Sequence, residues 1–134
     1  MTDPINSARP AINLPLWMWA VVAIEIMVPT YFAIASAVDP TIWGEARLGI
    51  YGELYVIRNL AMSFGVALSV FWLRSRVALL ATVAARYVTD LVDMGAGFAR
   101  GPDSETMVLL LVFGVVLLVI PAFGLRWLIR YRDV

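Results

Sequence analysis

The sequence contains no cysteine, no histidine and no lysine, and all ten of its basic residues are arginine. These absences exclude thiol chemistry, imidazole catalysis and a zinc site built from the usual nitrogen and sulfur ligands. Ten acidic residues balance the ten arginines, so no large positive field favours nucleic acid as a partner. There is also no glycine motif for a nucleotide, and we therefore expect neither a metal nor a cofactor.

Charge is scarce in this chain. Of the 134 residues, 62% are apolar and 15% are charged, whereas soluble domains are about half apolar and about a quarter charged. A soluble fold of this size would leave much of that apolar surface in water. The composition therefore predicts a single integral membrane domain over residues 1–134, with the lipid bilayer as its surroundings.

Four apolar stretches have about the length of 20 residues that a helix needs to cross a bilayer. They cover roughly residues 15–38, 50–73, 77–99 and 106–128, with a tight turn at 74–76. Because short connections make consecutive helices antiparallel neighbours, the sequence predicts an all-α, antiparallel four-helix bundle in the membrane.

Arginine is unevenly distributed between the ends of these stretches, and cytoplasmic flanks are usually the richer in arginine. The side that holds both termini and the middle turn carries more of them than the other side, which has Arg47 and Arg100. We therefore predict a multi-pass protein of the inner (cell) membrane with both termini cytoplasmic. The arginines on the richer side are Arg9, Arg74, Arg76, Arg126, Arg130 and Arg132.

Six ionisable residues lie inside the predicted spans. Each costs several kcal/mol in lipid unless it is paired or hydrated, so such residues are candidates for function. A rise of about 1.5 Å per residue places three of them near the bilayer midplane and the others further out. The six residues are Glu25, Glu53, Arg58, Arg86, Asp90 and Asp93.

On the third stretch, Arg86, Asp90 and Asp93 have the spacing of one helical face, and the first two are predicted to pair directly. Tyr55, Arg58 and Asn59 mark a polar side of the second stretch. We expect the charged faces to converge on one cavity that opens toward the outer leaflet, because convergence lets the charges pair and share water. Burial also disfavours ionised carboxyl groups, so at least one acid is expected to be neutral. The alternative is that the Arg–Asp pairs only hold the helices together.

The second and third stretches resemble the DoxX-like group of small four-helix bacterial membrane proteins. The resemblance covers about residues 49–101 and lies in Arg58-Asn59 with Gly65, and in Arg86, Asp90 and Asp93 ahead of Gly95 and Gly97. It implies a membrane redox or lipid-related role, although the lack of cysteine departs from thiol redox chemistry.

Three functions follow as hypotheses. The first is an acid–base enzyme that isomerises, cyclises or opens an epoxide in an apolar small molecule. Asp90, Asp93 and Glu25 would be catalytic, and the substrate-binding residues would be Arg58, Arg86, Asn59, Glu53 and Tyr55. The second is a small proton-coupled transporter that uses Glu25. It ranks below the enzyme, because inward arginines would repel a cationic substrate.

The third hypothesis is an accessory subunit of a larger membrane complex. The fourth stretch carries no charge between Glu105 and Arg126, so it suits contact with lipid, with a second copy or with a partner subunit. Gly114 and Gly124 would let helices pack closely there.

Overall fold

The computed structural model describes residues 12–39, 50–99, 101 and 104–131, and its regular secondary structure there is entirely helical. The η2 segment continues α2 directly, and η3 joins α4 to α5, so these elements form four rods that match the four predicted stretches. The all-helical prediction is confirmed. The elements are α1 (Leu16–Val38), α2 (Ile50–Ala67), η2 (Leu68–Trp72), α3 (Arg76–Ala99), α4 (Ser104–Gly114), η3 (Val115–Val119) and α5 (Ile120–Arg130).

The turn between the second and third rods lies where the sequence predicts it. Arg74 has a positive φ of 46°, a conformation that stops a right-handed helix. Ser75 then caps α3, because its Oγ accepts a hydrogen bond of 3.2 Å from the backbone N–H of Ala78.

Two π-helical segments, η2 and η3, were not expected from the sequence. At the end of η2 the backbone N–H of Leu73 donates to the carbonyl of Leu68 over 2.8 Å, one residue further back than in an α-helix. The η3 segment ends just before Pro121, whose ring removes one N–H from the helical ladder. Each segment locally changes which side chains its rod turns toward the neighbouring rods.

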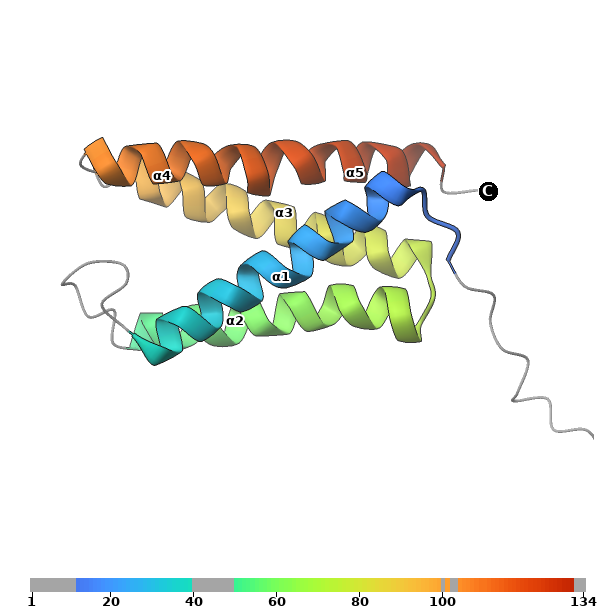
Figure 1. Ribbon diagram of the computed structural model, residues 1–134, viewed down its shortest axis with the longest axis horizontal. Helices are drawn as coiled ribbons and strands as arrows, with labels where there is room; N and C mark the ends of the chain where they lie inside the picture. Colours follow the sequence, from blue (N-terminus) through green and yellow to red (C-terminus); the bar gives the residue numbers. More distant parts are fainter. Residues whose placement is uncertain (1–11, 40–49, 100, 102–103, 132–134) are drawn as a thin grey trace, which may run out of the picture.

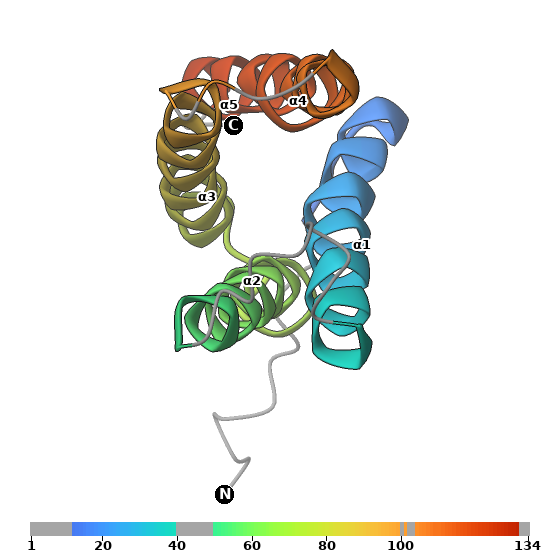
Figure 2. The same cartoon turned by 90° about the vertical axis from the view of Figure 1, so that its left-hand side faces the viewer.

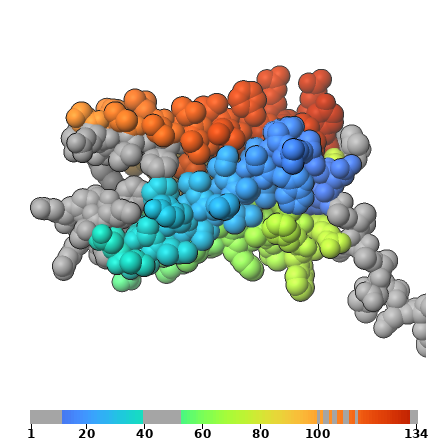
Figure 3. Space-filling view, viewed as in Figure 1, coloured from blue at the N-terminus to red at the C-terminus, as the bar shows by residue number. Residues whose placement is uncertain are grey.

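The four rods stand in a ring (Figures 1 and 2). The α1 helix contacts α2 and α5, and α3 contacts α2 and α5 on the other side. The α1 and α3 helices are therefore diagonal partners across the interior. In the space-filling view α1 crosses the face between the α4–α5 rod and the α2–η2 rod (Figure 3).

Arg76 ties three elements together at one end of the bundle. Its guanidinium donates to the carbonyl of Asn13 over 2.7 Å and to that of Tyr131 over 3.1 Å. It also lies 5.4 Å from the centre of the Trp127 ring, which meets Trp17 edge-on at 5.9 Å. Both ends of the described chain consequently lie at this end of the molecule.

Apolar side chains fill the same half of the interior. Met18, Val22, Leu79, Val83 and Leu128 are at most 2% exposed. At Gly124, a Cβ atom would come within 3.0 Å of Val21 Cγ1. The absence of a side chain thus lets α5 approach α1 closely, so this glycine serves packing inside the bundle rather than the predicted contact with lipid or a partner.

Two helices, Leu16–Val38 and Glu53–Trp72, are long and apolar enough to cross a membrane by length and composition. Their outer faces carry large exposed apolar side chains such as Met27, Phe64 and Phe71. Several residues used to predict the orientation, Arg9, Arg47, Arg100 and Arg132, lie outside the described part of the chain.

Candidate functional site

A buried ion pair lies in the interior on α3. Arg86 Nε donates to Asp90 Oδ2 over 2.9 Å, and the two side chains are 4% and 5% exposed. The predicted i, i+4 pair is therefore confirmed. The buried face of α3 consists of Leu79, Val83, Arg86, Asp90 and Met94, so the apolar half of the interior continues directly into this pair.

Asn59 connects the ion pair to the second rod. Its Oδ1 accepts a hydrogen bond of 2.6 Å from Arg86 Nη1, and its Nδ2 donates to the carbonyl of Tyr55 over 2.8 Å. Both ends of the amide are therefore engaged, and Asn59 is only 1% exposed. A charge-assisted hydrogen bond in a buried place is strong, so this contact fixes the rotation of α2 against α3.

Glu25 lies on α1, across the interior from α3. It is 1% exposed, and neither of its carboxyl oxygens has a hydrogen-bond partner among the described residues. It lies within electrostatic range of both Arg86 and Asp90. Buried polar groups are nearly always satisfied, so an unsatisfied carboxyl group beside an ion pair is the most unusual feature of this interior.

Ser63 is a second buried group without a partner in the described chain. It is 4% exposed, and its hydroxyl makes no hydrogen bond there. By contrast, Ser36 and Ser69 each donate to the carbonyl four residues back, over 2.7 Å. Sequence reasoning missed Ser63, although its position one turn after Asn59 places both on one face of α2.

A second ion pair connects α2 and α3 closer to the surface. Arg58 Nη1 donates to Asp93 Oδ1 over 3.2 Å, and Nη2 donates to Oδ2 over 2.5 Å. The salt bridge is therefore bidentate. The side chains are 36% and 39% exposed, and Arg58 lies 5.5 Å from the centre of the Tyr55 ring.

The second ion pair corrects the predicted stripe on α3. Asp93 turns toward α2 and pairs with Arg58, whereas Asp90 stays in the interior with Arg86. Each aspartate therefore contacts a different arginine, and their roles as acid and base stay a prediction.

Glu53 is also separate from the interior, since it is exposed in the first turn of α2. Two hollows are found elsewhere, and both are lined by Arg126 and Arg130 rather than by Glu25 or Asp90. The predicted cavity bounded by the six charged residues therefore stays a prediction, as does a void beside Glu25.

The charges of the interior can now be summed. Arg58 and Arg86 are each paired with one aspartate, which leaves Glu25 as the buried acid without a counter-charge of its own. In the described part of the chain, no three Asp or Glu side chains gather as metal ligands would.

Comparisons of this chain with protein-family models, with curated proteins and with solved structures found no match. The resemblance to the DoxX-like group therefore stays a prediction.

Proposed function

We propose that the chain is a multi-pass inner-membrane protein whose four rods all cross the bilayer, with both termini cytoplasmic. The two apolar spans support this placement, and the other two rods, α3 and α4–η3–α5, have comparable length. The charges on α3 that lower its apolar character are paired, which reduces their cost in a membrane.

Labelling of single cysteines tests this placement on a clean background, because the chain has no cysteine of its own. In intact cells, Ser104→Cys should react with an impermeant maleimide, since residue 104 begins α4 and the proposed orientation puts that end outside. Ser75→Cys, in the turn before α3, should react only after the cells are opened. The reverse pattern would refute the orientation.

Within this membrane protein, the interior between α1, α2 and α3 is proposed to bind an apolar small molecule that carries a polar oxygen group. The observation that supports this most is the Glu25 carboxyl group, which is buried without a hydrogen-bond partner in the described chain. A ligand hydroxyl or carbonyl group would satisfy it, and the Ser63 hydroxyl would provide a second hydrogen bond.

The residues would then have distinct roles in acid–base chemistry such as isomerisation, cyclisation or epoxide opening. Glu25 would give a proton to the ligand oxygen or take one from it. Asp90 would hold Arg86 from α3, and Asn59 would hold it from α2. Arg58 and Asp93 would brace α2 against α3 from outside the site.

Mass spectrometry of small molecules that copurify with the detergent-solubilised protein tests the ligand proposal. The wild-type protein should retain an apolar compound, and Glu25→Gln should reduce its amount about tenfold, because one good buried hydrogen bond is lost or mismatched. Glu53→Gln is the matched control, since Glu53 is exposed, and it should retain the wild-type amount. Equal retention by both variants would refute the role of Glu25.

A second candidate, a proton-coupled carrier, is favoured by one specific observation. Both arginines near the interior are neutralised by aspartates, so they no longer oppose a cationic substrate at Glu25. In vesicles that contain the protein and a pH-sensitive dye, this function predicts proton movement when a cationic substrate is added. Glu25→Gln should abolish that movement and Glu53→Gln should keep it, whereas the ligand-binding function predicts no movement for any of them.

A further inference from the structure

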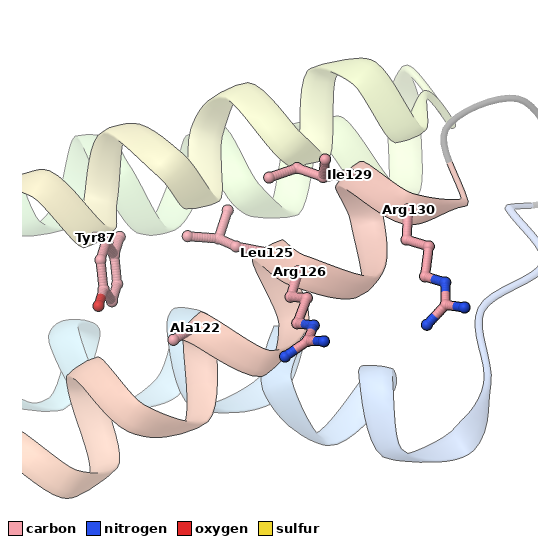
Figure 4. Close-up of a pocket in the computed structure, with 6 residues that line it drawn as sticks. All are labelled: Tyr87, Ala122, Leu125, Arg126, Ile129 and Arg130. Carbon is pink, nitrogen blue, oxygen red and sulfur yellow. The ribbon is translucent and has the colours of Figure 1, made fainter.

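An open groove of about 600 Å³ runs between α3 and α5, and Glu25 is not among its lining residues. Its lining changes in character along its length, as Figure 4 shows. Arg126 and Arg130 lie toward the end of α5, and Leu125 and Ala122 follow deeper along the same helix. Tyr87 faces the groove from α3, and Ile129 completes the lining.

Arg126 and Arg130 are spaced by one helical turn, so they share one side of α5. Both are exposed, and neither is paired with a carboxylate within the described chain. A second hollow of about 440 Å³ shares both arginines, and aromatic rings surround it. The rings belong to Trp17, Phe123, Trp127 and Tyr131.

The direction of the groove matches the depth of a membrane leaflet. With a rise of about 1.5 Å per residue, Ala122 lies ~12 Å deeper along the helix than Arg130, and Tyr87 lies ~16 Å from the start of α3. The charged part therefore lies at the proposed cytoplasmic surface, where tryptophan and tyrosine are also enriched. The apolar part runs inward over a distance that suits an acyl chain.

We propose that this groove binds an anionic phospholipid of the cytoplasmic leaflet. The phosphate lies between the guanidinium groups of Arg126 and Arg130, and one acyl chain lies along Ala122, Leu125 and Ile129. Arginine suits this task because its planar fork donates two hydrogen bonds to phosphate oxygens. Basic pockets between helices on the cytoplasmic side are a known physical basis for lipid selection. The inference rests on the proposed membrane placement and not on any ligand at Glu25.

Native mass spectrometry of the full chain in detergent tests this proposal. Dioleoyl phosphatidylglycerol and dioleoyl phosphatidylcholine are added in equal amounts, so that only the headgroup charge differs. The wild-type protein should retain phosphatidylglycerol preferentially, by about fivefold for each arginine that contacts the phosphate. Arg126→Gln with Arg130→Gln should remove the preference. Arg74→Gln removes one positive charge at the same end of the bundle but outside the groove, and it should keep the preference.

Two further experiments distinguish binding of the whole lipid from binding of its phosphate headgroup alone. Ala122→Phe keeps both arginines but fills the apolar part of the groove, and it should reduce retention of phosphatidylglycerol. Sodium phosphate at millimolar concentration should not displace the lipid. The proposal is refuted if the wild-type protein retains both lipids equally, if Arg74→Gln matches the double variant, or if phosphate alone displaces the lipid. Glu25→Gln should leave lipid retention unchanged, so failure of the interior site would be seen separately.

Discussion

The two Arg–Asp pairs of this protein have the same chemistry in different surroundings. Arg86 and Asp90 are neighbours on one helix and are at most 5% exposed, whereas Arg58 and Asp93 join two helices and are more than a third exposed. Removal of one partner from a buried pair leaves an uncompensated charge that costs about 3–5 kcal/mol. Exposed pairs contribute about 0–1 kcal/mol, because solvent screens them.

We therefore expect burial, more than the number of hydrogen bonds, to decide the cost of breaking each pair. The outer pair has the better two-pronged geometry, yet its charges can be hydrated when a partner is lost. The inner pair has one direct contact and a bridge through Asn59, and a lost partner there cannot be replaced by water. The free energy of unfolding of suitable variants tests the comparison.

The largest effect is expected for Arg86→Met. It should lower stability in detergent by about 3–5 kcal/mol, because Asp90 is left charged and buried. The double variant with Asp90→Leu should be more stable than Arg86→Met alone, since no unpaired charge remains. Both variants also lose the hydrogen bond to Asn59, so their difference isolates the effect of Asp90. Thermal unfolding measures the stability of Arg86→Met, of Asp90→Leu and of the double variant. If the double variant loses as much stability as the two single variants together, the pair is not coupled.

The next effect has the opposite sign and concerns Glu25, the acid that neither pair neutralises. Glu25→Leu should stabilise the ligand-free protein by about 1–3 kcal/mol, because it removes a buried carboxyl group without a hydrogen-bond partner. Glu53→Leu, a change of the same kind at an exposed position, should alter stability by about 0.5 kcal/mol or less. The same unfolding measurement applies. A loss of stability in Glu25→Leu would mean that the carboxyl group is satisfied within the fold.

The smallest effect is expected for Arg58→Met. Stability should fall by about 1 kcal/mol or less, and added salt should reduce the difference from the wild-type protein. Chemical unfolding at low and high salt measures both quantities. A loss as large as that of Arg86→Met would show that the outer pair faces lipid rather than water, and the contrast between the two pairs would then disappear.

The features that the sequence predicts correctly depend on neighbours along the chain. The length of the apolar stretches locates the rods, and the 74–76 turn follows from their ends. The Arg86–Asp90 pair follows from helical spacing, because residues four apart lie on one face whatever surrounds the helix.

The features that could not be predicted depend on how the helices are rotated against each other. Asp93 pairs with Arg58, which lies 35 residues away in the sequence, and only the packing of α2 on α3 selects that partner over Glu25 or Glu53. The missing partner of Ser63 has the same origin, because a serine in a helix can bond its own backbone, as Ser69 does. Neither spacing nor composition carries that information.

Arg76 holds the carbonyl groups of Asn13 and Tyr131 at the same time, and this has a consequence for how such a chain can be duplicated. An even number of antiparallel rods returns the end of the chain to the face where it began. In the proposed membrane placement, two copies joined in tandem by a short linker would consequently stand parallel and be related by an axis along the membrane normal. The inverted repeats found in many transporters need a unit with an odd number of spans, whose chain ends on the opposite face. Tandem fusion of this chain, with its even number of rods, cannot produce them.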